Sequence, residues 1–290
     1  MAAPDRDAVT LEAGLDALEL AHARRPPWWR RQLVPLTARL VAVGAVILAW
    51  QLAVALHVMK PAYLLPSPGE VFAVLVDQAQ AGHLQEAIFN SLRRGAVGYA
   101  FALVFGTVFG ILVSRVRLLR IGVGSLLSGL QSLPSVAWVP IGIIWFGLSD
   151  ATIYFVVVMG AFPSIANGIL AALDNIQPLL IRVGRSMGAR GVGLYRHVII
   201  PAAMPGYVAG LKQAWSFSWR SLMAAELIAH SQALGLGLGQ MLDNGRALSD
   251  LALVLLAIFA ILVVGVAIDE LIFSPLETGI RRRRGLVEGA

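Results

Sequence analysis

Polar segments divide this sequence into six stretches whose apolar residues run for about the 20 positions that a helix needs to cross a bilayer. The stretches lie at about 36–58, 88–113, 121–147, 151–173, 201–229 and 249–273. Of the 290 residues, 58% are hydrophobic and 14% are charged, whereas a soluble domain has about a quarter charged residues. The sequence therefore predicts an all-α, polytopic membrane protein with six transmembrane helices.

The third stretch contains Pro134 and Pro140, each of which would break or kink a helix. Broken helices persist in a membrane only where protein or water satisfies the freed backbone groups. We therefore expect 130–147 to lie inside the helix bundle, beside a cavity, rather than facing lipid.

The distribution of basic residues indicates the orientation of the chain. With the N-terminus inside, 17 of the 23 Lys and Arg residues fall in cytoplasmic segments, as the positive-inside rule requires. These residues are Arg6, Arg24, Arg25, Arg30, Arg31, Arg39, Arg115, Arg117, Arg120, Arg182, Arg185, Arg190, Arg196 and the run Arg281 to Arg284. We predict a cytoplasmic segment at 1–35, a transmembrane domain at 36–273 and a basic cytoplasmic tail at 274–290 that touches anionic lipid. For Met1–Glu19, a short surface helix and disorder both stay open.

Residues 59–87 form the largest outer segment, and the helix expected within it is too short to span the membrane. Ser67-Pro68-Gly69-Glu70 starts a helix with proline in its first turn. The apolar residues that follow, such as Val71 and Leu75, share one face. This pattern predicts a helix lying at the membrane surface.

Several functional classes are excluded by composition and motif. The net charge of +6 would suit a nucleic-acid partner, but the basic residues border apolar blocks, so we predict no nucleic-acid binding. The chain has no cysteine, and its five histidines lack metalloprotease spacing. It also has no Gly-Lys-Ser/Thr phosphate loop, so ATP would have to bind another chain. We expect neither an enzyme nor a bound cofactor.

The cytoplasmic loop 174–200 between the fourth and fifth spans is the most informative segment. Its apolar residues recur at helical spacing and need a protein partner or the bundle itself to cover them, although an ordinary amphipathic connector is an alternative. Gly188 permits a sharp turn between two short helices, and Pro201 suits the first turn of the next span.

This loop resembles the coupling segment of ABC importer inner-membrane permeases, which has a Glu-Ala-Ala start, a glycine and a later proline. The matching positions are Gly188, Val198, Ile200 and Pro201. Arg182 stands where the family has its acidic residue. The resemblance implies that the loop inserts into a cleft of an ABC ATPase subunit. The residues it implies for this role are Arg182, Arg185, Ser186, Met187, Gly188, Ala189, Tyr195 and Pro201.

Four more motifs resemble the aliphatic sulfonate, taurine and nitrate branch of that family. They are Leu65-Pro66-Ser67-Pro68, Pro134-Ser135-Val136-Ala137-Trp138-Val139-Pro140, Trp145-Phe146-Gly147 and Ala224-Ala225-Glu226-Leu227. The resemblance covers about 61–284 and implies a type I importer permease in the bacterial inner membrane, carrying a small anion. It also implies partners: ATPase subunits holding ATP and Mg²⁺, a second permease copy forming a homodimer, and an extracytoplasmic substrate-binding protein.

The fifth span carries polar and aromatic residues along one line of the helix. Lys212, Ser216, Trp219 and Glu226 lie within about 40° of that line, with Arg220 beside it. Intramembrane charges normally face the bundle interior or water, so the line predicts a substrate path. Interhelical ion pairs and charges snorkelling to the membrane surface are the alternatives.

The candidate substrate-path residues are Arg220, Ser216, Trp219, Lys212, Gln131 and Trp138. For an anion, Arg220 near mid-membrane is the best contact, and Glu226 is expected to pair with another helix instead. Arg93 and Arg94 are interpreted as structural anchors, with substrate capture as the alternative. Gly106 and Gly110 predict helix packing, within the chain or at a subunit interface.

A second class of function is a secondary transporter driven by an ion gradient. Such a protein would favour inverted repeats and paired broken helices. The sequence has one broken span and no convincing repeat, so this class stays the alternative.

Overall fold

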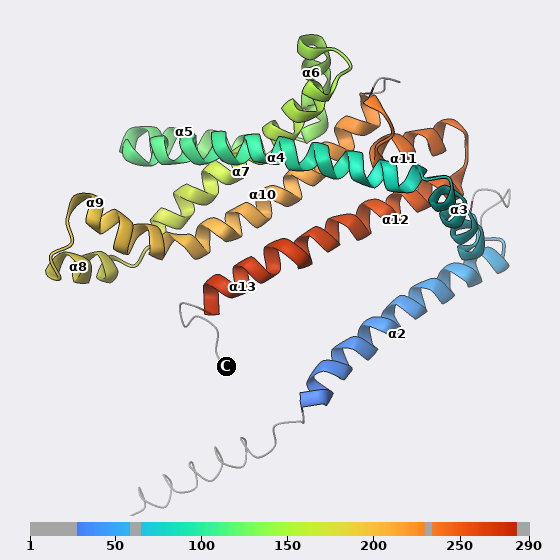
Figure 1. The fold of residues 1–290 in the computed structure, drawn as a ribbon, viewed down its shortest axis with the longest axis horizontal. Coiled ribbons are helices and arrows are strands. Elements are labelled where there is room, and N and C mark those ends of the chain that lie inside the picture. The colour runs from blue at the N-terminus through green and yellow to red at the C-terminus, as the bar shows by residue number, and fades with distance from the viewer. Residues whose placement is uncertain (1–27, 59–64, 230–233, 283–290) are drawn as a thin grey trace, which may run out of the picture. The chain divides into compact units, whose positions relative to one another are not determined.

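The computed structural model describes residues 28–58, 65–229 and 234–282 (Figure 1). The predictions for 1–27 and for Arg283 and Arg284 lie outside these residues. The chain divides into two compact units, Met1–Pro68 and Gly69–Ala290, which are described separately. The described residues form helices and connecting turns, with no strand among them.

The described part of the first unit is dominated by the helix α2 (Trp28–Ala55). Its apolar part, Val41–Ala55, covers most of the first predicted span. The indole Nε1 of Trp50 donates a hydrogen bond to the carbonyl of Pro66 at 3.0 Å, which ties Pro66 to the helix.

The second unit begins with α3 (Pro68–Gln80), which starts at Pro68 as the sequence predicted. It is followed by the long helix α4 (His83–Arg115). Gly82 joins the two helices with a φ of 81°, in the left-handed region that glycine adopts readily.

The third predicted span is broken, which confirms the prediction made from its prolines. α5 (Arg117–Ser132) ends before Pro134, a 3-10 turn follows, and α6 (Val139–Phe146) leaves at a bend of 97°. The residues next to the break line a cavity, as expected. The expectation that the whole stretch lies inside the bundle is wrong for α6, because Ile144 and Trp145 are 80% and 65% exposed in the single chain. Two backbone hydrogen bonds form at the break: the N–H of Leu133 donates to the carbonyl of Leu130 at 3.3 Å, and the N–H of Ala137 donates to the carbonyl of Pro134 at 3.0 Å.

α7 (Asp150–Asp174) lies at the centre of this unit and packs against α4 and α10 (Ile200–Ile228). Small residues allow the close approach. A Cβ on Gly210 would lie 2.8 Å from Cα of Gly168, so the two backbones are nearly in contact.

The glycines of α4 also pack inside the chain. A Cβ on Gly106 would meet Ile165, and one on Gly110 would meet Ala166, both on α7. Of the two interpretations of this glycine pair, the structure therefore supports packing within the chain rather than a subunit interface.

The loop between the fourth and fifth spans forms α8 (Pro178–Ser186), α9 (Gly191–Leu194) and a π-helical turn, Tyr195–Ile199, that runs into α10. Figure 1 shows α8 and α9 beyond the ends of α7 and α10, away from α11. Pro201 lies in the first turn of α10, as predicted.

The chain closes with α11 (Leu238–Ala247) and α12 (Leu251–Ile268), which continues through a π turn into α13 (Ser274–Arg282). Among the described residues, three helices are long and apolar enough to cross a membrane, or four with the bent pair α5–α6. α10 is 29 residues long but carries Lys212, Arg220 and Glu226. The six-span topology therefore stays a prediction.

Candidate functional site

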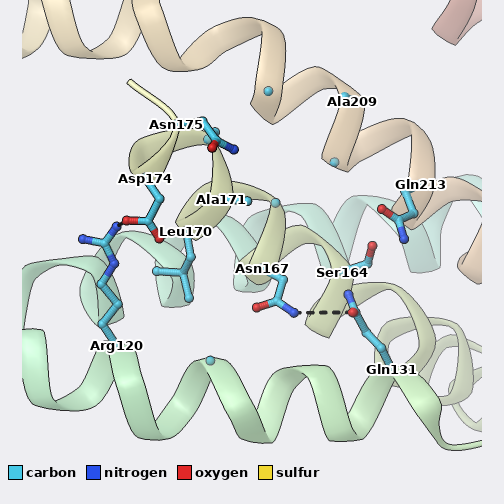
Figure 2. Close-up of a pocket in the computed structure, with 15 residues that line it drawn as sticks. Arg120, Gln131, Ser164, Asn167, Leu170, Ala171, Asp174, Asn175, Ala209 and Gln213 are labelled. Atoms are coloured by element: carbon cyan, nitrogen blue, oxygen red, sulfur yellow. Dashed lines mark hydrogen bonds and ion pairs between the residues drawn. The ribbon is translucent and has the colours of Figure 1, made fainter. Parts of the chain in front are cut away.

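A polar cavity of about 650 Å³ lies between α5, α7 and α10 (Figure 2). We call it the larger cavity. Its polar lining consists of Arg120 and Gln131 from α5, Ser164, Asn167, Asp174 and Asn175 from α7 and its end, and Gln213 from α10. The Asn167 amide donates to Oε1 of Gln131 at 3.4 Å, which links α7 to α5 across the cavity.

Part of the cavity wall consists of residues with no side chain or a single methyl group, which leaves space for the cavity. Gly168, Gly206, Ala209 and Gly210 line it where α7 and α10 cross. Hydrogen-bonding side chains thus project over a surface formed largely by backbone. Apart from Arg120 and Asp174, the polar groups of the lining are neutral amides and hydroxyls, which suit a polar solute.

A second cavity of about 320 Å³ adjoins the broken span. We call it the smaller cavity. Gln131 lines both cavities, so they follow one another along α5. The structure brings three predicted path residues, Gln131, Trp138 and Arg220, together around the smaller cavity.

Arg220 is an exposed residue of α10. Its guanidinium carbon lies 4.6 Å from the centre of the Phe217 ring, and its Nε donates to the carbonyl of Ser216 at 3.1 Å. Among the described residues, the structure gives Arg220 no carboxylate partner. Arg220 therefore lines the smaller cavity without a carboxylate counter-ion from the described part of the chain.

The other residues of the predicted line on α10 separate in the structure. Lys212 Nζ pairs with Asp269 at 3.1 Å, and Trp219 Nε1 donates to the carbonyl of Ile261 at 3.2 Å. Both contacts hold α10 against the α12–α13 helix. Ser216 remains exposed, next to Arg220. Lys212 and Trp219 thus face the bundle of this chain, and of the residues on the predicted line only Ser216 lies on the side of Arg220.

Glu226 is the last residue of the same line, and it forms a buried ion pair. Its Oε1 lies 3.0 Å from Nη1 of Arg94, and neither side chain has any exposed surface. Ser91 donates to Oε2 at 2.7 Å, and the backbone N–H of Gly239 donates to the same atom at 3.0 Å. The predictions that Glu226 pairs with another helix and that Arg94 is an anchor are confirmed.

The predicted coupling segment forms a compact hairpin of two short helices. α8 ends in a Schellman-type cap, in which Gly188 has a φ of 87° and Ala189 N donates to the carbonyl of Gly184 at 3.0 Å. Met187 is 82% exposed at the tip. The guanidinium of Arg115 lies 4.8 Å above the ring of Tyr195, which ties the base of the hairpin to α4.

The remaining residues predicted for coupling follow the same geometry. Arg182, Arg185 and Ser186 are exposed on α8, and Ala189 is half-buried. Pro201 is half-buried at the start of α10. The structure thus brings all of them into one projecting element, apart from Pro201 at its base.

Five polar groups at the cavity were missed by reasoning from the sequence: Ser164, Asn167, Asp174, Asn175 and Gln213. A signal for the first three exists, because Ser164, Asn167 and Asp174 recur at spacings of three and seven, on one face of a helix. Arg120 was interpreted only as a charge that sets orientation. In the structure it forms an ion pair with Asp174.

Comparisons with known proteins all match membrane components of transport systems. Residues 102–272 match the family described as binding-protein-dependent transport system inner membrane component. The taurine transport system permease protein of Escherichia coli is 25% identical over 83% of this chain and 90% of that protein. The nitrate import permease protein of Leptolyngbya laminosa is 29% identical over 64% of this chain and 65% of its own.

A solved structure has a similar fold. It is the MetNI methionine ABC transporter in inward-facing conformations, with a TM-score of 0.52 and 21% identity, covering 68% of this chain and 95% of the matched chain. The family match and this fold agree on a helical membrane component with the architecture of an importer permease.

Proposed function

The chain belongs to the family of binding-protein-dependent transport system inner membrane components, and from this premise we propose that it forms the substrate path of an ATP-driven importer for a small anion. The chain is the membrane component, and ATP and Mg²⁺ bind to a separate ATPase subunit. The lack of a phosphate loop in the sequence supports this division. Two relatives are named for taurine and for nitrate, which both carry an anionic, oxygen-rich group.

The observation that carries the proposal is the environment of Arg220. A charged side chain at membrane depth is costly unless it faces water or a partner. Arg220 lines the smaller cavity, is exposed, and has no carboxylate partner among the described residues. Its planar guanidinium offers paired donors that match the geometry of oxyanions. Arg220 therefore makes the first strong contact with an anion inside the membrane.

The larger cavity continues the path with neutral groups. Gln131, Ser164, Asn167 and Gln213 can all hydrogen-bond to an anion without holding it by charge. A transport site has to bind its solute strongly enough to admit it and weakly enough to release it. A lining of amides and hydroxyls meets both requirements.

A second copy of the chain completes the path. The two cavities are open on the side where Arg220 and Gln213 are exposed, and an open polar groove cannot face lipid. A homodimer closes the groove by placing two such walls opposite each other. The path then lies between subunits, with surrounding lipid on the outer faces.

The hairpin of α8 and α9 couples this path to the ATPase. Met187 and Val192 are each 82% exposed, which is unfavourable for apolar side chains in the cytoplasm unless a protein covers them. Docking into a cleft of the ATPase covers both. ATP binding then shifts the permease between inward-facing and outward-facing states through the movement of this hairpin.

The orientation and the remaining partner follow from the same arrangement. The protein lies in the bacterial inner membrane, multi-pass, with both termini and the hairpin in the cytoplasm. An extracytoplasmic binding protein delivers the solute to the opposite face. The family match weighs against the alternative of an ion-gradient-driven transporter.

The proposal is tested on the complete importer in proteoliposomes, with labelled taurine, nitrate and an alkanesulfonate outside. Arg220→Gln should lower uptake by about tenfold or more, the loss expected for one charge-assisted hydrogen bond. ATP hydrolysis and assembly should persist, and Arg220→Lys should retain part of the uptake. Arg246→Gln, which removes an exposed arginine near the end of α11, is the matched control. Wild-type uptake by Arg220→Gln, or failure of that variant to assemble, would contradict the role of Arg220.

A further inference from the structure

Arg120 and Asp174 form an ion pair in the wall of the larger cavity (Figure 2). Arg120 precedes Gln131 by 11 residues on α5, which corresponds to about 16 Å along the helix axis. Gln131 marks the point where the larger and smaller cavities meet. The pair therefore lies at the end of the larger cavity that is remote from Arg220.

The charges along the two cavities are few and widely separated. Among the described residues that line the larger cavity, Arg120 is the one cation and Asp174 the one anion. Arg220 is the cation of the smaller cavity. An anion that leaves Arg220 and passes the amides of Gln131 and Asn167 would thus next meet the guanidinium of Arg120.

The exposure of the pair suits exchange of the counter-ion. The side chains of Arg120 and Asp174 are 31% and 57% exposed, whereas those of Arg94 and Glu226 are both 0% exposed. A partly exposed pair contributes little to stability because water screens it, so its carboxylate can be replaced at small cost. A fully buried pair cannot be opened in this way. The buried pair of Arg94 and Glu226 is therefore structural, whereas the partly exposed pair of Arg120 and Asp174 can open.

We propose that Arg120 is a second anion-binding station at the inner end of the path, and that Asp174 is its resident counter-ion. The transported oxyanion displaces the carboxylate of Asp174 from Arg120. The carboxylate returns when the anion leaves, so Arg120 never stays uncompensated and the anion is not retained. This inference rests on the proposed function and adds a release step to it.

The proposal predicts effects of opposite sign for the two partners. Asp174→Asn removes the competitor and should strengthen anion binding, whereas Arg120→Gln removes the station and should weaken it. If the pair had only a structural role, both changes would break the same contact and act in the same direction. The sign of the effect thus separates a binding station from a structural contact.

The measurement uses the nucleotide-free complex of permease and ATPase in nanodiscs, with sodium nitrate and sodium ethanesulfonate as probes at constant ionic strength. The midpoint of thermal unfolding is followed against anion concentration, because a bound anion stabilises the folded complex. Asp174→Asn should lower the half-saturating concentration by about fivefold, and Arg120→Gln should raise it by at least about as much. Asp243→Asn and Arg246→Gln alter an ion pair outside the two cavities and should leave the titration unchanged.

Repeating the titration in an Arg220→Gln background separates this inference from the proposed function. Opposite shifts for Asp174→Asn and Arg120→Gln in that background support the inner station, even if Arg220→Gln itself transports normally. Shifts of equal sign, or no shift in either variant, overturn the inner station while leaving the test of Arg220 intact.

Discussion

Arg94 Nη1 lies 3.0 Å from Glu226 Oε1, and neither side chain has any surface exposed. The guanidinium also binds Asp150 Oδ1 at 2.8 Å and the backbone carbonyl of Leu234. One arginine on α4 thus holds α7, α10 and the segment before α11 together. A buried charge is tolerated only when it is paired and hydrogen-bonded, and here each of the three guanidinium nitrogens of Arg94 has an acceptor.

We expect Glu226→Gln to destabilise the protein by about 3–5 kcal/mol, because Arg94 would stay buried with one of its two carboxylate partners missing. The free energy of unfolding, or the thermal midpoint of the purified permease, measures this loss. Uptake per assembled complex should change little. The double variant Arg94→Gln/Glu226→Gln should be less destabilised than Glu226→Gln alone, since it leaves no buried arginine and Asp150 keeps its ion pair with Arg93 at 3.2 Å. Wild-type stability with impaired uptake would instead place Glu226 in the substrate path.

The crossing of α7 and α10 gives a second prediction. A Cβ on Gly210 would lie 2.8 Å from Cα of Gly168, and backbone cannot move aside as a flexible side chain can. Gly210→Ala should therefore cost about 1–3 kcal/mol of stability and should narrow the larger cavity. Gly122→Ala on α5 is the matched control, because nothing lies within 4 Å of its added Cβ. Equal stability of the two variants would show that the helices separate easily at this crossing.

The features that reasoning from the sequence predicted are those set by local covalent geometry. Pro134 and Pro140 predicted the break that becomes a 97° bend, and Pro68 predicted the start of α3. Gly188 predicted the turn between α8 and α9, where its φ is 87°. In each case one residue restricts or frees its own backbone, so no knowledge of distant neighbours is needed.

The direction in which α10 faces its neighbours could not be predicted in the same way. Helical spacing placed Lys212, Trp219 and Glu226 on one line, but spacing does not say which side of a helix the rest of the chain covers. Asp269 and Ile261, far along the sequence, bind Lys212 and Trp219 and turn that line inward. The cavities therefore lie beside the line, on the side of Arg220, Gln213 and Ser216.

Topology can be checked without background labelling, because the chain has no cysteine. Ala81, between α3 and α4, and Met187, at the tip of the hairpin, are both exposed in the structure. Ala81→Cys should react with a membrane-impermeant thiol reagent added to intact cells, and Met187→Cys should react only after the cells are opened. Labelling of Met187→Cys in intact cells would reverse the orientation that we predict.

The last prediction concerns the hairpin and its partner. Gly188 has a φ of 87°, and its N–H donates to the carbonyl of Arg185 at 3.0 Å. Proline fixes φ near −65° and has no N–H, so Gly188→Pro should destroy the turn, whereas Gly188→Ala should strain it by about 1–2 kcal/mol.

We expect Gly188→Pro to insert into the membrane normally but to lose co-purification with the ATPase subunits, or to lose coupling of ATP hydrolysis to uptake. Gly188→Ala should show a smaller defect of the same kind. Gly193→Ala in α9 serves as the control, because its added Cβ meets nothing within 4 Å and it is not among the residues with positive φ. The hairpin projects from the bundle with Met187 exposed, so a damaged turn should spare the fold and the cavities while moving the docking surface. If Gly188→Pro retained uptake and substrate-stimulated ATP hydrolysis at wild-type rates, the ATPase would have to dock elsewhere on this chain.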